Sequence, residues 1–589
     1  MVCRLLFALL LTAAAAAAAV AAERPLARFA VAETAPTEVS ALLDRVLQSS
    51  ASEAGAVDRE EEERLLRRLR AETIDVLSTE GYFAPKITIE PDAGGNARYL
   101  VKLELGPRTL VTEVQIDFTG AITNQPERER RLRSGWELPV GEPFRDSKWS
   151  NAKSQLLNRV RSRDYAAARL ADSYAEVSVE NATAKLHVTI DSGPVYTIGE
   201  LQVKGLVRYD RNLVQRYSPF KVGDPYNANK LLDFQRALQS TPYFGTVVVD
   251  ANPEQATDHR VPVVVELTEA KTRRLSLALG YSTDTGVGAE VAYRQTLLFG
   301  FPYTLQSGVG AYSRERSVAY ADILLPPKPD GEQDSFGALY ERTDIQGLLT
   351  YRWAVGAQRT YKRTSGRAMY DTTLALNFQR ERTEVLSDQS ANTANDVVAG
   401  TYSWTRRNVD SLTNPTRGDL LTLSGTLGLR RSGLTQLLSQ NFERVYGRYV
   451  YYWPLSPRDQ LILRAEGGHV FVDNVSIVPN EYLFRTGGVG TVRGYAYQSL
   501  GTKTGTATTG SKSLLVGSTE YVRWLTKEWG AAAFFDIGNA DDDILHKGFA
   551  RGYGVGARYR TLAGPIALDL AYGDRSRTLR LHFSIAIAF

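Results

Sequence analysis

Residues 481–501 read EYLFRTGGVGTVRGYAYQSLG, and this stretch separates two interpretations of the whole chain. Its five glycines in 21 residues disfavour both a helix and a well-packed strand, so we predict a loop. Within it, Val492-Arg493-Gly494-Tyr495 places an arginine beside a flexible residue and an aromatic one. If the surrounding chain is a membrane barrel, Arg493 needs an acidic partner or water. If the chain is soluble, Arg493 is one more surface arginine.

The first 22 residues have the pattern of an export signal. Arg4 precedes an apolar run at 5–20, and Ala21 and Ala22 then lead into the charged Glu23. A charged start, an apolar centre and small residues at the end are the parts of a secretory signal peptide, so we expect cleavage after Ala22. A transmembrane anchor is the alternative, but the run is short and rich in alanine.

The composition limits the functions open to the exported chain. The only cysteine, Cys3, lies in the segment to be removed, so no disulfide and no Cys/His metal site is expected. A net charge of +4 on 589 residues does not indicate a nucleic-acid partner. The five histidines lack ligand spacing, and no glycine-rich stretch joins a strand to a helix. We therefore predict no enzyme, no cofactor and no metal, with calcium at Asp541–Asp543 as a remote alternative.

From Glu23 to Thr268 one pattern recurs three times, at roughly 75 to 85 residues. Each copy reads as strand, helical region, strand, strand. In the third copy Asn227 can cap a helix, and in the second copy Asp146 is expected to do the same. The third copy is the clearest, with a strand at 198–206, helices at 210–217 and 227–239, and strands at 246–250 and 261–267.

Gly-Pro pairs mark the junctions between the copies. Gly106-Pro107 and Gly193-Pro194 each end one copy and lead directly into the next strand. Such short junctions favour a semi-rigid string of domains over domains on loose linkers. The predicted domains are a signal peptide at 1–22, three α+β domains at 23–108, 109–194 and 195–269, and an all-β region at 270–589.

After about Lys271 the helical patterns stop and short alternating runs take their place. A second sheet covering one face, or lipid, would explain this alternation, and the export signal together with the terminal aromatic favours lipid. At about 20 residues per strand and connection, the region holds about 16 strands, to within two. The last run is the sharpest, because one face carries Leu579, Leu581, Phe583, Ile585, Ile587 and Phe589.

The repeated β-α-α-β-β unit resembles the POTRA domain, the polypeptide-transport-associated module. The resemblance rests mainly on Val222-Gly-Asp-Pro-Tyr226, a helix, and then Thr241-Pro-Tyr-Phe-Gly-Thr-Val-Val-Val249. It implies a periplasmic location and the capture of client or partner strands at a sheet edge.

Three such domains, a barrel and the Val492–Tyr495 motif together resemble the superfamily of BamA, TamA and the two-partner-secretion transporters. In that family the arginine motif lies in a loop folded into the lumen. A later strand carries Phe-x-Asp-x-Gly, and a glycine-rich strand follows it. The matching residues here are Phe534, Asp536 and Gly538 for the first of these strands, and Gly554, Gly556 and Arg558 for the second.

The resemblance implies a specific tie inside the barrel. A desolvated guanidinium without a partner is costly, so Arg493 is expected to pair with Asp536 and pin the loop to the inner wall. Gly494 and Gly538 would allow close backbone approach, and Tyr495 is expected to pack on a glycine track at 552, 554 and 556. The alternative is that both charged groups are simply hydrated in the lumen.

The implied function is assembly or translocation of β-rich outer-membrane proteins, such as autotransporters, across a lateral gate. The gate lies between the first strand, with Leu275, Leu277, Leu279 and Gly280, and the last strand at 579–589. Three POTRA domains point to a TamA-like member, with an inner-membrane-anchored TamB-like partner, unfolded barrel clients and lipid as partners. The alternative is a dedicated pore of the two-partner-secretion type for one exported substrate.

Overall fold

The structure is a computed structural model that describes residues 27–31, 39–43, 45–46, 59–94, 98–313, 316–432, 436–562 and 564–588. The predicted signal peptide and Phe589 lie outside the described residues. The chain divides into two compact units. One contains Met1–Gln202, Pro219–Asp233 and Val249–Val264, and the other contains Val203–Ser218, Phe234–Val248 and Val265–Phe589.

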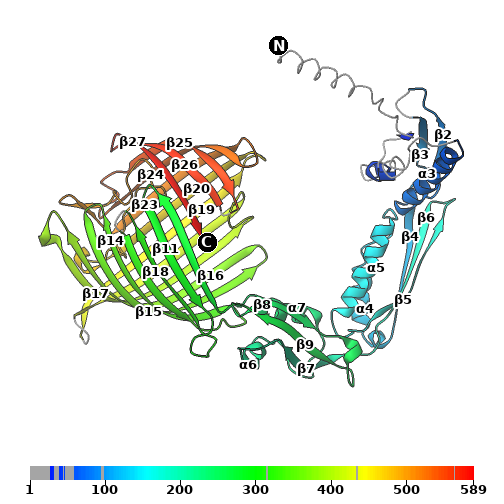
Figure 1. Cartoon of the computed structure of the whole chain (residues 1–589), viewed down its shortest axis with the longest axis horizontal. Helices are drawn as coiled ribbons and strands as arrows, with labels where there is room; N and C mark the ends of the chain where they lie inside the picture. Colours follow the sequence, from blue (N-terminus) through cyan, green and yellow to red (C-terminus); the bar gives the residue numbers. More distant parts are fainter. Residues whose placement is uncertain are drawn as a thin grey trace, which may run out of the picture. The chain divides into compact units, whose positions relative to one another are not determined.

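Three small sheets with the same strand order follow one another in the chain (Figure 1). In each, the last strand of the copy lies between the other two, and in the first two sheets it runs parallel to the opening strand. The first copy contains β1 (Ala27–Val31), α3 (Arg59–Thr79), β2 (Lys86–Pro91) and β3 (Tyr99–Glu104). The first copy therefore opens with a strand, as the predicted order of its elements requires.

The second copy packs two helices on its sheet. It contains β4 (Leu110–Thr119), α4 (Pro126–Ser134), α5 (Asp146–Arg161), β5 (Arg169–Ser178) and β6 (Thr183–Asp191). Trp149, Leu156 and Val160 of α5 are buried against the sheet. The expected cap at Asp146 is wrong, because Arg145 occupies the N-cap position and no side chain caps this helix. Asp146 instead places its negative charge in the first turn, where it favours the helix dipole.

The third copy contains β7 (Thr197–Lys204), α6 (Arg211–Gln215), α7 (Ala228–Gln239), β8 (Phe244–Asp250) and β9 (Arg260–Glu269). Asn227 caps α7 as predicted, since its Oδ1 accepts hydrogen bonds from the N–H groups of Asn229 and Lys230 at 3.0 and 3.2 Å. None of the described helices is long and apolar enough to cross a membrane.

The rest of the chain forms a closed antiparallel barrel of 16 strands within the described residues, which confirms the predicted fold class (Figure 1). Neighbouring strands are consecutive in sequence, apart from the hairpin β21–β22, which lies outside the barrel sheet. The first eight strands are β10 (Arg273–Ser282), β11 (Gly286–Gln295), β12 (Thr304–Tyr312), β13 (Arg316–Leu324), β14 (Glu332–Ile345), β15 (Leu348–Ser365), β16 (Ala368–Val385) and β17 (Thr393–Val409). The other eight are β18 (Gly418–Ser432), β19 (Gln436–Pro454), β20 (Asp459–Phe471), β23 (Ser513–Trp524), β24 (Trp529–Asp541), β25 (Ala550–Thr561), β26 (Gly564–Gly573) and β27 (Thr578–Ala588).

The barrel closes through a short seam between its first and last strands. β10 pairs with β11 along all ten of its residues, but with β27 only over the five residues from Ala278 to Ser282. Residues 273–277 have no strand partner on the seam side among the described residues. Among the described residues, this half of β10 is therefore an open sheet edge.

The stretch quoted first is a loop, as predicted. It belongs to the connection between β20 and β23, which also carries the short hairpin of β21 (Thr502–Thr504) and β22 (Ala507–Thr509). Val492, Arg493 and Tyr495 in this loop are almost fully buried against the inner wall of the barrel. We call residues 472–512 the lumen loop.

Candidate functional site: an ion-pair network inside the barrel

Strand register brings polar and charged residues from the five consecutive strands β23 to β27 to one patch of the inner wall. Ser518 of β23 lies opposite Asp536 of β24. Asp569 of β26 lies between Gly556 of β25 and His582 of β27. Because side chains on paired residues of antiparallel strands share a face, these groups all point into the lumen where the loop enters.

Arg493 of the lumen loop lies at the centre of this patch. Its guanidinium donates to both carboxylate oxygens of Asp536, with Nε–Oδ2 at 2.8 Å and Nη2–Oδ1 at 3.0 Å. Its backbone N–H also donates to Asp536 Oδ2, at 3.1 Å. The Asp536 side chain is 0% exposed and that of Arg493 is 5% exposed. The ring of Phe534 lies 3.4 Å from Arg493 Cζ, so the predicted Phe-x-Asp pair holds the arginine from two directions.

Two further carboxylates complete the surroundings of Arg493. Its Nη1 donates to Glu520 at 2.6 Å and to Asp569 at 3.1 Å. Arg558 bridges the same two carboxylates, with distances of 2.7 Å to Glu520 and 2.5 Å to Asp569. Paired guanidinium and carboxylate groups avoid the penalty of a lone buried charge. The predicted residues Asp536 and Arg558 are thus members of one network.

The glycines of the predicted motifs make room for the loop backbone. A Cβ on Gly552 would lie 1.9 Å from the carbonyl oxygen of Arg493, and one on Gly538 would lie 3.0 Å from Cγ2 of Val492. Gly494 has a φ of 90°, a conformation that favours glycine. Its own Cβ would also lie 2.7 Å from the backbone nitrogen of Gly573.

Tyr495 does not pack along the whole glycine track that the sequence suggested. Gly554 instead faces the ring of Phe534, and Gly556 faces Asp569 and Arg558. The glycine beside the Tyr495 ring is Gly573 on β26, where an added Cβ would lie 3.1 Å from Tyr495 Cζ. The expectation differs because motif spacing does not reveal on which neighbouring strand a loop residue will lie.

The hydroxyl of Tyr495 fixes the loop to the turn between β26 and β27. It lies 2.6 Å from Asp574 Oδ1 and 3.0 Å from the carbonyl oxygen of Arg551, and it accepts from the N–H of Arg575 at 3.0 Å. The motif therefore contacts the strand pair that leads to the barrel seam.

His582 is a member of the site that the sequence analysis did not identify. It lies on β27, the last strand, and its side chain is 3% exposed. Its Nε2 accepts a hydrogen bond from the N–H of Gly494 at 2.9 Å, so the proton of the neutral ring is on Nδ1. The signal for this residue was the alternation of the last strand, which places His582 on the inner face.

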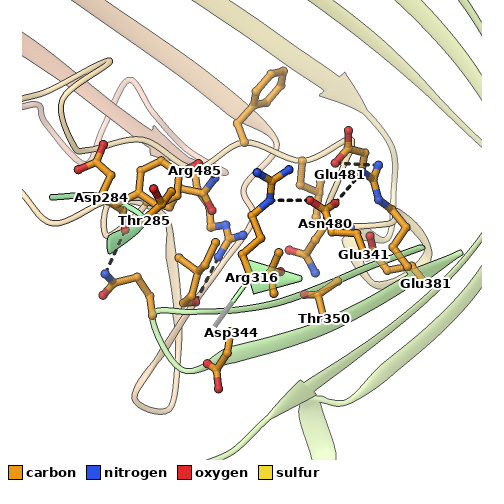
Figure 2. A pocket seen from close by; sticks show the side chains of 18 of the residues that line it. Asp284, Thr285, Arg316, Glu341, Asp344, Thr350, Glu381, Asn480, Glu481 and Arg485 are labelled. Carbon is orange, nitrogen blue, oxygen red and sulfur yellow. Dashed lines mark hydrogen bonds and ion pairs between the residues drawn. The ribbon is translucent and has the colours of Figure 1, made fainter. Parts of the chain in front are cut away.

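The opposite side of the lumen loop borders a polar cavity of about 630 Å³ (Figure 2). Arg352 of β15 joins Glu341 of β14, at 2.7 Å, to Glu481 of the loop, at 3.0 Å. Arg316 of β13 donates to the same Glu341 at 2.9 Å. Gln346 donates to the carbonyl oxygen of Tyr497 at 3.0 Å. The loop is thus bound to both sides of the barrel interior.

The charged groups of the interior do not form a metal site. No group of three histidine, cysteine or acidic residues in the described part of the chain is placed to hold a metal ion. The carboxylates nearest Arg493 are occupied by guanidinium groups. These ion pairs attach the lumen loop to the inner wall of the barrel.

The predicted gate residues lie on the two strands of the seam. Leu275, Leu277 and Leu279 of β10 are between 50% and 63% exposed and face outward. Gly280 pairs with Ala586, and Leu279 pairs with Ile587 through the backbone. Ile585 pairs with Tyr281, whose ring centroid lies 6.2 Å from that of Phe583. Phe589 lies outside the described residues.

These features define a class of protein: a transmembrane β-barrel with tandem α+β domains before it and an inward-folded loop tied to its wall. Residues 267–589 match the Omp85 superfamily domain, and residues 196–270 match the POTRA family of surface antigen variable number repeats. The chain belongs to the Omp85 superfamily. It is accordingly an outer-membrane barrel with periplasmic POTRA domains.

Relatives with established names are similar to this chain over part of their length. The outer membrane protein assembly factor BamA of Neisseria meningitidis serogroup B is 24% identical over 427 residues, which are 66% of this chain and 50% of that protein. BamA of Nitratidesulfovibrio vulgaris is 24% identical over 405 residues, 64% of this chain and 48% of that protein. The chain thus spans about half the length of these relatives.

The fold is similar to that of a solved BamA structure. The crystal structure of BamA from Haemophilus ducreyi lacking POTRA domains 1–3 superposes with a TM-score of 0.69 at 16% identity, covering 82% of this chain and 100% of that one. The chain is therefore similar to BamA proteins in its backbone fold as well as in its sequence.

Proposed function

We propose that the protein is an outer-membrane assembly or translocation factor that inserts or secretes β-rich proteins, autotransporters among them, through its barrel seam. The observation that carries the proposal is the seam itself, where β10 pairs with β27 over five residues and leaves residues 273–277 without a strand partner in the described chain. Unpaired backbone groups at a sheet edge can template another strand. The assembly-factor names of the two relatives support the same function.

Lateral opening of the seam requires the rupture of few bonds. The seam pairs five residues of β10 with β27 and adds one backbone hydrogen bond from Thr283 to Phe583, whereas β10 pairs with β11 along ten residues. Each backbone hydrogen bond contributes about 1 kcal/mol net. The pairing of β10 with β27 is therefore weaker than its pairing with β11. A client strand that pairs with residues 273–277 would replace water at those groups and lengthen the opening stepwise.

The POTRA domains supply further strand-binding edges. The sheet order β4-β6-β5 leaves β5 at an edge, and β5 is ten residues long with Tyr174 54% exposed. We assign the capture of a periplasmic partner to such edges, with a TamB-like, inner-membrane-anchored protein as the candidate. No nucleotide is available in the periplasm, so client folding into the membrane is the source of free energy.

A disulfide across the seam tests the gate. The only native cysteine is Cys3, so Leu279→Cys with Ile587→Cys joins two paired residues without competing thiols. Oxidation should abolish insertion of unfolded barrel clients into vesicles that contain the protein, and reduction should restore it. The matched control is Leu279→Cys with Ala289→Cys, which joins β10 to β11 and should leave activity intact. Full activity of the oxidised seam variant would refute the lateral gate.

The client range separates this function from a dedicated pore. An assembly factor should accelerate the insertion of several unrelated barrel clients, whereas a transporter of the two-partner type should export a single substrate and accelerate none of them. Co-purification of an inner-membrane-anchored partner that is lost when β5 is altered would support the role of the POTRA domains.

A further inference from the structure

The outer wall of the barrel carries a row of arginines at one end of β14–β18. Strand register makes Tyr340, Trp353, Arg380, Asp396 and Arg431 successive partners across these five strands. A parallel row, two residues nearer the strand ends, contains Arg342, Tyr351 and Arg382. We call the two rows together the arginine rim.

The arginine rim faces outward and lies on the extracellular side. Glu341, Arg352 and Glu381 line the lumen cavity, so the residues next to them in each strand point to the opposite face. Trp353 is 59% exposed and the Arg380 side chain is 51% exposed. Because β10 starts directly after the periplasmic POTRA domains, the Ile345 end of β14 and the Val385 end of β16 are extracellular.

Positive charge exceeds negative charge within the rim. Its four arginines are accompanied by one carboxylate, Asp396, which Arg380 engages with two hydrogen bonds at 2.8 and 2.7 Å. Arg382 and Arg431 also interact electrostatically with Asp396, but both hydrogen bonds of this carboxylate within the rim come from Arg380. The nearest further carboxylates in register, Asp344 and Glu384, lie one level closer to the strand ends and do not balance the arginines.

Arg431 has an additional feature that points to a ligand. Its Nε is buried and has no hydrogen-bond partner in the described chain, and its Cζ lies 5.8 Å from the ring of Phe378. A buried donor without a partner is costly, and an anion placed at the rim would satisfy it. Phe378 in turn lines an apolar hollow.

This hollow lies on the same wall, directly beneath the rim. It has a volume of about 590 Å³, and small side chains such as Ser307, Ala319, Ala321 and Ala338 form its floor. Tyr340, Trp353 and Phe378 border it, and Trp353 is the register partner of Arg380. An apolar groove therefore leads up to a cluster of guanidinium groups at the water boundary of the lipid-facing band.

We propose that this surface binds a phosphorylated lipid of the outer leaflet, lipopolysaccharide, with its phosphate groups at Arg382 and Arg431 and an acyl chain in the hollow. Guanidinium groups match phosphate oxygens through paired hydrogen bonds, which lysine cannot reproduce. Arginine at the headgroup level above an apolar surface is the arrangement that recognises an anionic lipid. The arginines lie on β14–β18 and the hollow extends over β11–β16, so the site does not include the seam strands β10 and β27 and is independent of the proposed assembly activity.

The binding test uses the full-length protein in detergent, with lipopolysaccharide added and bound lipid measured by native mass spectrometry. Arg382→Gln with Arg431→Gln should weaken binding at least about tenfold. The matched control is Arg363→Gln with Arg367→Gln, the same charge change at two exposed arginines, one near the periplasmic end of β15 and one in the turn before β16. Equal binding by both double variants and the unaltered protein would overturn the proposal.

Two further arms separate the parts of the ligand. The unaltered protein should bind dephosphorylated lipopolysaccharide as weakly as the Arg382→Gln/Arg431→Gln variant binds the intact lipid. Inorganic phosphate at equal concentration should not displace the intact lipid from the unaltered protein. Ala338→Trp, which fills the hollow, should lower lipid binding several-fold. If the dephosphorylated lipid bound as well as the intact one, the arginines would have no role in recognition. Retained heat-modifiable migration on gels verifies that each variant is folded.

Discussion

At the scale of single residues, Arg493 is the group on which the interior depends most. Replacing it with alanine would leave Asp536, with its 0% exposed side chain, without its main cation. Breaking a buried ion pair from one side costs about 3–5 kcal/mol, so we expect Arg493→Ala to lower the free energy of unfolding by that amount. Urea unfolding in detergent measures this change in the free energy of unfolding. Exposed Arg363→Ala is the control and should change stability by less than about 0.5 kcal/mol.

The reversed pair Arg493→Asp with Asp536→Arg should not restore stability. An aspartate at position 493 would face Glu520 and Asp569, which lie 2.6 and 3.1 Å from the present guanidinium. Like charges at this distance repel strongly in a poorly solvated interior. Full recovery in the double variant would mean that the pair acts in isolation and that the wider network has no role.

His582 links the lumen loop to the last strand through one hydrogen bond. His582→Ala would leave the N–H of Gly494 buried without an acceptor, which costs about 1–3 kcal/mol. His582→Gln retains an acceptor at a similar distance from the backbone and should lose much less. The rate of disulfide formation between Leu279→Cys and Ile587→Cys tests whether His582 influences the seam. This rate should change in the His582→Ala variant only. The same rate in all three proteins would show that the histidine does not communicate with the seam.

Some of these residues could be predicted from the sequence. Others could not, for a physical reason. Arg493 and Asp536 belong to local motifs, so their meeting could be anticipated. Glu520, Asp569 and His582 lie on three different strands, and only strand register brings them to the same patch. A shift of one residue would turn each side chain to the other face, and register is set by turns and cannot be read from one strand.

At the scale of elements, the end of β9 is held by a carboxylate that gives a pH prediction. Burial alone would raise the pKa of Glu269, but hydrogen bonds from the Arg208 side chain and from the N–H groups of Val207, Arg208 and Tyr209 outweigh it. They lower the pKa from 4.5 to about 2. The side chain is 4% exposed and lies four residues before the first barrel strand.

A carboxylate with a lowered pKa in the folded state stabilises the fold above its unfolded pKa. This contribution should be complete above about pH 4.5 and disappear as the pH falls toward about 2. Glu269→Gln should destabilise the junction by about 1–3 kcal/mol at pH 7 and by much less near pH 2. Hydrogen exchange of the amides of residues 207–209, compared at the two pH values after correction for intrinsic rates, measures the difference. A pH-independent difference would contradict this account.

Elements with strong periodicity were predictable, and those without it were not. The alternation of apolar residues identified β10 and β27 as strands. The apolar face of α5 identified it as a helix. Helix α4, PERERRLRS, has Leu132 as its only buried residue. Its sequence therefore lacks the amphipathic pattern from which a helix is predicted. The number of barrel strands agreed with the estimate because strand length is set by the thickness of the membrane.

At the scale of the whole molecule, the two compact units predict separable stability. The barrel unit includes residues 203–218 and 234–248 of the third POTRA domain, whereas the first two domains belong to the other unit. Within the barrel unit, Tyr243 donates to the carbonyl oxygen of Pro302 at 2.6 Å, and Tyr209 contacts Thr296 at 2.9 Å. The third domain is therefore attached to the turns after β11, and its removal should damage the barrel.

Deleting residues 23–194 removes the first two POTRA domains at the Pro194–Val195 boundary and leaves this attachment in place. The barrel should then keep its urea midpoint and heat-modifiable migration, because the interior network and the seam are intact. Binding of a periplasmic partner should be lost, since β5 and its edge are gone. Deleting residues 23–269 should lower the barrel's midpoint, because the contacts at Thr296 and Pro302 are lost. If the shorter deletion destabilised the barrel as much as the longer one, the stability of the barrel would depend on the first two domains, contrary to this prediction.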